Sequence, residues 1–303
     1  SNSFFGEMVR NLTFMKIALG SAQFGLSYGV ANVYGKVASD EIAKIRDVAF
    51  ANNIDTLDTA IAYGDSEIAL GLVGVDHFKV VTKLPNVPEN TTDISSWVHT
   101  EVKASLKRLK TKSLYGLLVH NPGSLLGSKA QELASSLESL KASGIVSKIG
   151  VSIYDPYVLN DIASVTDLDL VQAPLNVIDR RLITSGWLKK LARMGVEIHT
   201  RSSFLQGLLL LPRDKIPSRF EAWSSLWDFW HYELEKKGLD PITECLRYVL
   251  SVSEVDRVVV GVETATQFNE IIGLAAGASS LTDWSSMVCD DERLINPSNW
   301  ELL

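Results

Sequence analysis

The sequence contains few cysteines and no long apolar run. Its 303 residues include only Cys245 and Cys289, and neither belongs to a CxxC or CxxH arrangement. A reducing cytoplasm fits this cysteine usage, and we expect no metal site. No stretch of 18 apolar residues occurs, so the sequence predicts no transmembrane helix and no membrane partner.

Positive charge is also scarce. The formal net charge is −7, and no run of basic residues occurs, so nothing indicates a nucleic-acid partner. Hydrophobic residues make up 46% and charged residues 21%, which is typical of a soluble globular protein. Residues 1–14 lack the apolar core of a signal peptide, so we interpret them as an N-terminal extension or a cloning remnant. We expect residues 15–303 to form a single domain, and the sequence does not predict an oligomeric state.

Eight short apolar segments alternate with amphipathic helices along the chain. The predicted strands cover residues 16–19, 54–57, 78–83, 114–119, 148–151, 169–171, 196–200 and 257–260. Continuous apolar strands between helices indicate parallel pairing with both faces covered, so the sequence predicts an α/β fold, a (β/α)8 TIM barrel. Residues 220–237 are predicted to add an extra helix after the seventh strand. The alternative is an open doubly wound sheet, but residues 20–25 do not match the G-x-G-x-x-G pattern of that fold.

The segment from residue 53 to residue 67 places polar groups beside the end of a strand. Asp58 follows the second apolar strand, and Tyr63 comes five residues later on a loop. Gly64 permits a sharp turn, and Ser66 is predicted to cap the next helix, with Glu67 in its first turn. The alternative is an ordinary polar strand-to-helix turn with a packed tyrosine.

Other polar residues occupy the ends of the remaining strands. The residues at or just after strand ends are Asp58, Tyr63, Lys83, His120, Ser152, Gln172, Arg201, Ser202 and Gly261. In a closed barrel of parallel strands, these ends meet at one rim, where active sites lie. No nucleophile elbow, HExxH motif or cluster with metal-ligand spacing accompanies them.

A phenol, an amine, a carboxylate and an imidazole form a plausible proton-transfer group. A tyrosine is a weak acid at neutral pH, but a neighbouring ammonium stabilises the phenolate. A carboxylate keeps the buried lysine charged, and the imidazole can bind a substrate oxygen. This combination predicts proton donation to an oxygen that gains negative charge, as in carbonyl reduction, with the hydride supplied by a cofactor. Each group alone is also compatible with a structural role, such as a buried Lys–Asp pair.

The pattern Asp58-Thr59-Ala60, then Tyr63-Gly64-x-Ser66-Glu67, with Lys83 and His120 at later strand ends, resembles the aldo-keto reductase superfamily. The resemblance extends from about residue 16 onward. It implies a TIM barrel, a nicotinamide cofactor (NADH or NADPH) and a small-molecule carbonyl substrate. It also implies that Tyr63 is the general acid, that Asp58 and Lys83 tune it, and that His120 orients the carbonyl.

The resemblance also implies a cofactor-binding set. Gly150-Val151-Ser152 resembles the family segment that contacts the nicotinamide carboxamide, although Ile153 replaces the usual Asn, and Gln172 matches a second carboxamide contact. Residues 202–209 resemble the loop over the pyrophosphate. The complete cofactor-binding set is Gly20, Ser21, Ser152, Gln172, Arg201, Ser202, Leu205, Gly207, Gly261, Glu263, Thr264, Gln267 and Glu270.

Two departures from the family pattern concern the cofactor. Arg201 stands where relatives often place an aromatic ring against the nicotinamide, and a guanidinium plane can also stack. Glu263 and Thr264 stand where relatives place a Ser and an Arg for the adenosine 2′-phosphate. A carboxylate repels a phosphate but accepts a hydrogen bond from a ribose hydroxyl, so we expect NADH to be used at least as well as NADPH.

The sequence leaves the reaction open at several points. The first interpretation is reduction of an aldehyde or ketone, with sugar-derived carbonyl compounds included. One alternative is the same chemistry run as an alcohol or sugar dehydrogenase. Another is a cofactor-binding regulatory module, like the reductase-fold β subunits of potassium channels. Trp223, Trp227 and Trp230 form a helical stripe, for which core packing is favoured over a substrate-covering lid.

Overall fold

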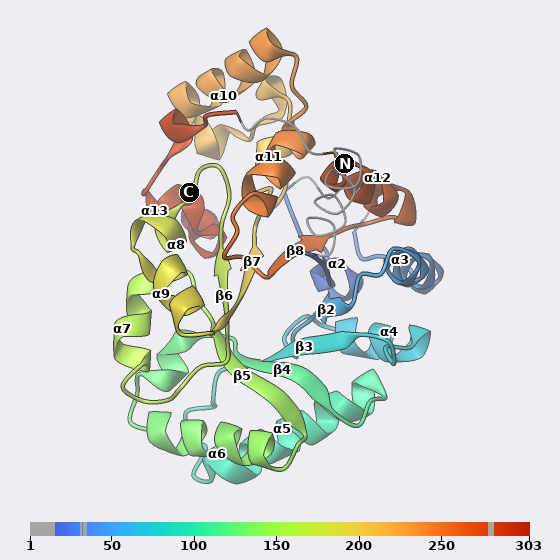
Figure 1. The fold of residues 1–303 in the computed structure, drawn as a ribbon, viewed down its shortest axis with the longest axis vertical. Helices are drawn as coiled ribbons and strands as arrows, with labels where there is room; N and C mark the ends of the chain where they lie inside the picture. The colour runs from blue at the N-terminus through green and yellow to red at the C-terminus, as the bar shows by residue number, and fades with distance from the viewer. Residues whose placement is uncertain (1–15, 31, 33–34, 278–281) are drawn as a thin grey trace, which may run out of the picture.

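The eight strands form one closed parallel barrel in chain order, with β8 returning to pair with β1 (Figure 1). The computed structural model describes residues 16–30, 32, 35–277 and 282–303. The strands are β1 (Ile17–Gly20), β2 (Thr56–Asp58), β3 (Lys79–Leu84), β4 (Leu114–Val119), β5 (Val146–Ser152), β6 (Leu170–Pro174), β7 (Glu197–Arg201) and β8 (Arg257–Gly261). The predicted (β/α)8 barrel is therefore confirmed, and the open doubly wound alternative is wrong.

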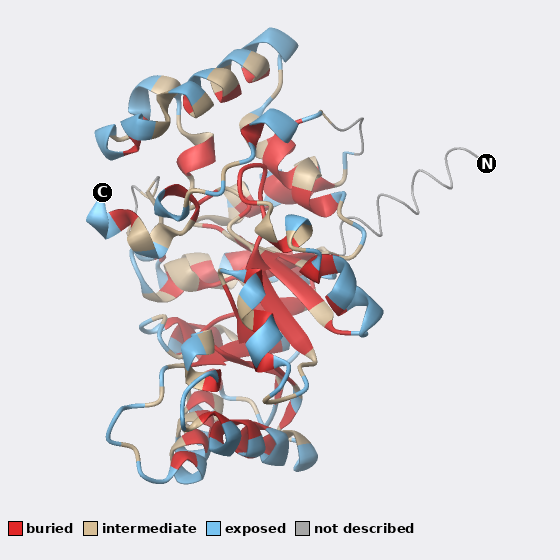
Figure 2. Ribbon diagram, turned by 90° about the vertical axis from the view of Figure 1, so that its left-hand side faces the viewer, coloured by how far each residue is buried: buried red, intermediate tan, exposed pale blue. Residues whose placement is uncertain are grey.

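Helices surround the barrel and turn their exposed faces outward (Figure 2). The α-helices are α2 (Ala22–Gly25), α3 (Ser39–Ala51), α4 (Ser66–Val73), α5 (Ile94–Leu109), α6 (Ala130–Ala142), α7 (Leu159–Ile162), α8 (Arg181–Thr184), α9 (Trp187–Arg193), α10 (Ser224–Lys237), α11 (Pro241–Leu250), α12 (Ala265–Ala275) and α13 (Glu292–Ile295). Short 3₁₀ turns are η1 (Pro122–Leu125), η2 (Pro156–Val158), η3 (Leu208–Leu210), η4 (Arg213–Lys215), η5 (Ser218–Trp223), η6 (Ser285–Met287) and η7 (Pro297–Leu302). The predicted N-terminal extension, residues 1–14, lies outside the described residues.

The extra helix predicted after the seventh strand is present as α10, preceded by η5. Trp227 and Trp230 lie on the buried face of α10. The indole N–H of Trp227 donates to the carbonyl of Phe220, and that of Trp230 donates to the carbonyl of Leu209. They belong to a hydrophobic cluster that also includes residues of the C-terminal segment, such as Trp284. The prediction of core packing is confirmed for Trp227 and Trp230, whereas Trp223 is only partly buried against this cluster.

The start of α4 differs from the prediction. Asp65, rather than Ser66, occupies the cap position, and no side chain caps this helix. Ser66 is instead fully buried, and its hydroxyl donates to Ser21, whose own hydroxyl donates to the carbonyl of Asp58. The hydroxyl of Ser66 also lies 3.0 Å from that of Thr59. The prediction of Ser66 as a cap was therefore wrong, because its hydroxyl links the ends of β1 and β2 to α4.

Candidate active site

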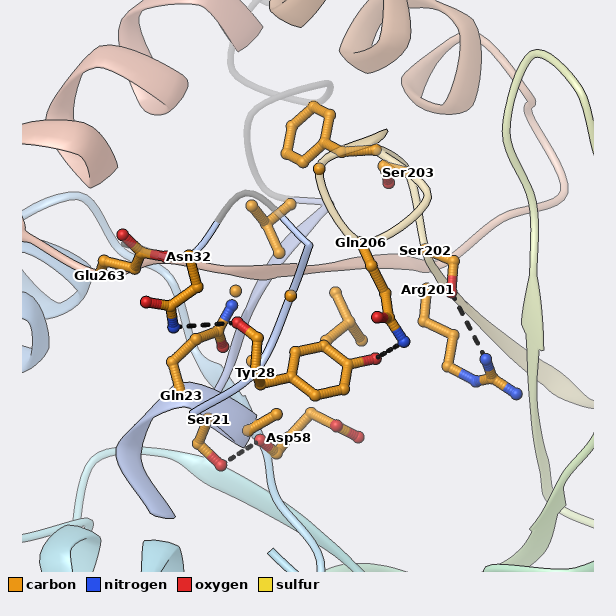
Figure 3. A pocket seen from close by; sticks show the side chains of 18 of the residues that line it. Ser21, Gln23, Tyr28, Asn32, Asp58, Arg201, Ser202, Ser203, Gln206 and Glu263 are labelled. Carbon is orange, nitrogen blue, oxygen red and sulfur yellow. Dashed lines mark hydrogen bonds between the residues drawn. The ribbon is translucent and has the colours of Figure 1, made fainter. Parts of the chain in front are cut away.

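A cavity opens at the carboxyl ends of the barrel strands (Figure 3). The strand-end and loop residues predicted from the sequence that line it are Gly20, Ser21, Asp58, Tyr63, Gln172, Arg201, Ser202, Gly207, Gly261, Glu263 and Gln267. They come from both ends of the chain because β1 pairs with β2 on one side and with β8 on the other, so that Gly20 adjoins both Asp58 and Gly261. Closure of the barrel therefore assembles this cavity.

Asp58 and Lys83 form a buried ion pair below the cavity. The Lys83 ammonium donates to the Asp58 carboxylate at 2.7 Å and to the carbonyl of Thr59 at 2.8 Å. Both residues are almost completely inaccessible to solvent. Burial alone would lower the pKa of Lys83, but the charge of Asp58, with a contribution from Tyr63, outweighs it, so the pKa is raised. The lysine therefore remains an ammonium group.

Tyr63 lies directly beside this ammonium group. The nitrogen of Lys83 is 4.9 Å from the centre of the Tyr63 ring. The loop that carries the tyrosine is fixed by close backbone contact between Gly25 and Gly64. A Cβ atom on Gly25 would lie 1.6 Å from the carbonyl oxygen of Tyr63, and Gly64 has a φ of +53°. Only residues without a Cβ permit this approach, so the two glycines set the position of the phenol.

His120 packs against the ring of Tyr63. Their ring centres are 5.7 Å apart and the rings are nearly perpendicular. Burial, and then the charge of Lys83, lowers the pKa of His120 to about 4. The imidazole is therefore neutral near pH 7, which lets it form a hydrogen bond with a carbonyl oxygen without carrying charge.

Gln172 crosses the barrel interior and touches the ion pair. Its amide nitrogen donates to the second oxygen of Asp58 at 2.7 Å. Its amide oxygen is buried and has no hydrogen-bond partner within the described part of the chain. The side-chain oxygens of Gln23 and Ser203, which line the same cavity, are also buried without a hydrogen-bond partner among the described residues. Each such group costs about 1–3 kcal/mol unless a donor satisfies it, so the cavity is suited to a ligand rich in N–H and O–H groups.

These unsatisfied oxygens match what a nicotinamide dinucleotide offers, namely a carboxamide NH₂ and ribose hydroxyls. Gly261 at the end of β8 leaves room for the side chain of Gln23 in the same cavity, because a Cβ on Gly261 would lie 2.5 Å from the Gln23 amide. The residues present therefore fit the cofactor that the resemblance implies.

Arg201 contributes a positive charge to the cavity, and no other cation lines it among the described residues. Its guanidinium group donates to the carbonyl of Ile153 at 2.9 Å and lies 4.2 Å from the centre of the Tyr154 ring. Cation–aromatic stacking and the carbonyl contact hold the guanidinium plane in one orientation. This fixed cation is placed to contact an anionic or aromatic part of a ligand.

The loop after β7 has a strained backbone where it borders the cavity. Ser202, Leu205 and Gln206 have φ values of +62°, +48° and +53°, and Gly207 has +87°. The side chain of Asn176 supports this loop by donating to the carbonyl of Ser202 at 2.9 Å. Non-glycine residues in this conformation cost about 1–3 kcal/mol each and cluster at ligand sites.

Four predicted cofactor residues do not line the cavity. Ser152 is buried at the end of β5 and pairs in register with Gln172. The side chain of Leu205 lies in the hydrophobic cluster under α10, so any ligand contact would have to come from its backbone. Thr264 caps α12 by accepting from the N–H of Gln267, and Glu270 is exposed on the same helix.

The structure also places residues in the cavity that the sequence did not single out. Tyr28, Gln206, Gln23 and Ser203 lie on its wall, and the Gln206 amide donates to the Tyr28 hydroxyl at 3.1 Å (Figure 3). Gln23 lies in the short helix α2 and the other three lie on loops, and no periodic pattern marks these segments. Burial, followed by the charges of Tyr63 and Tyr154, raises the pKa of Tyr28 to about 12. Tyr28 is thus a second phenol in the cavity, but a much weaker acid than a free tyrosine.

No helix in the described residues has both the length and the apolar character needed to cross a membrane. Within the same residues, no group of three or more His, Cys, Asp and Glu side chains is arranged to hold a metal ion.

Solved structures with a similar fold include an aldo-keto reductase from Bacillus halodurans, at 19% identity and a TM-score of 0.71 over 92% of this chain and 95% of that one. A glycerol dehydrogenase from Gluconobacter oxydans matches at 23% identity and a TM-score of 0.68, with 93% of each chain covered. A putative aldo-keto reductase from Pseudomonas aeruginosa matches at 21% identity and a TM-score of 0.64, covering 86% of this chain and 89% of that one. No curated protein sequence gives a significant match.

Residues 16–286 match the model of the aldo/keto reductase family. This match covers most of the chain, including every strand of the barrel. The chain therefore belongs to the aldo/keto reductase family and is an NAD(P)-dependent oxidoreductase of that type.

Proposed function

We propose that the chain reduces a small aldehyde or ketone to an alcohol, with Tyr63 as the general acid. The observation that carries this proposal is the arrangement of Lys83, which is held charged by Asp58 on one side and faces the Tyr63 ring on the other. Such an arrangement stabilises a phenolate and therefore favours release of the phenolic proton.

In this proposal, each residue of the site has a separate role. Reduced nicotinamide, when bound, supplies the hydride. Tyr63 donates a proton to the carbonyl oxygen as that oxygen gains negative charge, and the ammonium of Lys83 stabilises the phenolate left behind. His120 donates a hydrogen bond to the same oxygen and orients it. Gln172 and Ser203 would hold the cofactor through their unsatisfied oxygens.

The reverse direction is a second candidate. A glycerol dehydrogenase is among the proteins with a similar fold, and the same proton-transfer group operates on an alcohol when Tyr63 acts as the base. A regulatory module that binds the cofactor without turnover is the third. These candidates differ in whether steady turnover occurs and in which direction.

A screen of aldehydes, ketones and sugars with NADH and NADPH, and of alcohols with NAD⁺ and NADP⁺, tests the proposal. Turnover with at least one carbonyl compound is expected, followed as a change in nicotinamide absorbance. Turnover with alcohols alone would favour the dehydrogenase. Cofactor binding without turnover on the whole panel would favour the regulatory module.

The enzyme is predicted to use NADH at least as well as NADPH. No ion pair holds the carboxylate of Glu263 within the described residues, so a 2′-phosphate beside this carboxylate would meet repulsion without a compensating cation. We expect kcat/KM with NADH to equal or exceed that with NADPH, and Glu263→Ser/Thr264→Arg to move the preference toward NADPH. Glu263→Ser alone is the control, because Thr264 also caps α12. A wild-type preference for NADPH of tenfold or more, about 1.4 kcal/mol, would contradict this prediction.

Arg201→Ala is predicted to weaken cofactor binding by about tenfold, since a fixed cation that contacts the pyrophosphate or the nicotinamide contributes roughly 1–2 kcal/mol. Binding of a substrate analogue should change less. Fluorescence titration with cofactor and, separately, with a competitive inhibitor measures both. Unchanged cofactor affinity would remove Arg201 from the proposed cofactor site.

We also propose that the protein is located in the cytoplasm. Both cysteines are free thiols, which is the state that a reducing compartment maintains.

A further inference from the structure

The start of α12 borders the cavity, where Glu263 and Gln267 line the wall. The same cavity holds the unsatisfied, deeply buried oxygens of Gln172 and Ser203. The N–H groups at the start of a helix point outward and favour anions, so this end of the helix would suit a phosphate on the adenosine side of a dinucleotide.

In this chain, side-chain acceptors already occupy N–H groups at and just before the start of α12. The N–H of Ala265 donates to a carboxylate oxygen of Glu41 at 2.8 Å. The N–H of Gln267 donates to the hydroxyl of Thr264, and the N–H of Glu263 donates to the side-chain oxygen of Gln267. A phosphate arriving here would have to displace the chain's own acceptors.

Glu41 reaches this position from a neighbouring element. It lies in the first turn of α3, which packs against α12 (Figure 1). Its side chain is about one-quarter exposed, and its carboxylate also accepts from Lys44 at 3.1 Å. The Ala265 N–H, and then Lys44, lowers the pKa of Glu41, so the side chain is ionised at neutral pH.

We propose that Glu41 determines cofactor specificity by placing its own carboxylate where a 2′-phosphate would bind. The inference rests on the proposed use of a nicotinamide dinucleotide and adds a second residue to Glu263. Glu41 acts in two ways. It occupies the N–H of Ala265, and it adds a negative charge at the positive end of the α12 dipole.

Asp40 provides a matched control on the same helix. It precedes Glu41 in sequence, its carboxylate is 3.9 Å from Lys44, and its side chain is 78% exposed. No hydrogen bond links it to α12 within the described residues. Replacing Asp40 therefore removes the same charge from α3 without freeing the start of α12.

The test compares binding of 5′-ADP and 2′,5′-ADP to the full chain by titration calorimetry. In Glu41→Gln the charge is lost but the acceptor is kept, whereas Glu41→Ala also frees the Ala265 N–H. Glu41→Gln is expected to raise affinity for 2′,5′-ADP relative to 5′-ADP about fivefold, the size typical of one partly exposed charge. Glu41→Ala should raise it further, and Asp40→Asn should change it less than about twofold.

A structural role alone would lower the melting temperature of Glu41→Ala and leave the ratio of the two affinities unchanged. That result would overturn the inference, as would an equal shift in Asp40→Asn. If Glu263→Ser shifts the ratio but Glu41→Gln does not, the proposed cofactor site stands and the role of Glu41 is wrong. If the wild type binds neither nucleotide, the proposed cofactor site itself is wrong and Glu41 loses its role with it.

Discussion

Tyr63→Phe is expected to reduce kcat by a hundred- to ten-thousandfold, the range typical of losing a general acid. Cofactor affinity should stay within about twofold, because the substitution removes only the hydroxyl group and keeps the ring in contact with Lys83 and His120. The backbone contact of Gly25 with this loop is also untouched. Steady-state kinetics and fluorescence titration of the cofactor measure the two quantities.

Tyr28→Phe is the matched control, since Tyr28 is a second phenol in the same cavity. Its hydroxyl accepts a hydrogen bond from Gln206, and its raised pKa disfavours proton release. We expect this variant to keep most of its kcat. If Tyr63→Phe retains more than about a tenth of wild-type turnover, a barrier change below about 1.4 kcal/mol, the acid is another group.

Lys83→Met is expected to reduce kcat about a thousandfold, because the phenolate of Tyr63 loses its neighbouring cation. The same substitution leaves the Asp58 carboxylate buried with Gln172 as its side-chain partner, so a loss of about 3–5 kcal/mol in unfolding free energy is also expected. The pH dependence of kcat and the unfolding curve measure these two effects.

Asp58→Asn/Lys83→Met separates the two effects. The double variant removes both charges of the buried pair, so much of the lost stability should return. Turnover should remain low, because the cation near Tyr63 is still missing. A double variant with near wild-type turnover, or a single variant with an unchanged pH–rate profile, would exclude the proposed role of Lys83.

The ends of the strands could be predicted from the sequence because short apolar runs define them to within three residues. Asp58, Lys83 and His120 stand at such ends, and a closed barrel brings all strand ends to one rim. The second strand was predicted to cover residues 54–57, whereas β2 begins two residues later, at Thr56, and ends at Asp58. The pairing of Asp58 with Gly20, rather than the apolar pattern, sets where β2 ends.

Contacts between distant elements could not be predicted in this way. Glu67 was expected to favour its helix as a first-turn acid, but it is fully buried. It accepts hydrogen bonds from Thr82, Ser105 and Arg108, and so joins α4 to β3 and α5. The sequence pattern of an acidic residue in a first helical turn does not distinguish a solvent-exposed side chain from a buried one with three hydrogen-bond partners. Glu41, 224 residues from Ala265, shows the same ambiguity.

The hydrogen bond between Gln172 and Asp58 joins positions 114 residues apart and has a consequence for how the protein becomes active. Tyr63, Lys83 and His120 all precede β5, whereas Arg201, the loop after β7 and the start of α12 follow it. During synthesis, a nascent chain that has emerged only as far as η1 carries every proposed proton-transfer residue but lacks most of the cofactor cavity. The two parts meet only when β8 pairs with β1, so an unfinished chain cannot consume reduced cofactor before its last strand is in place.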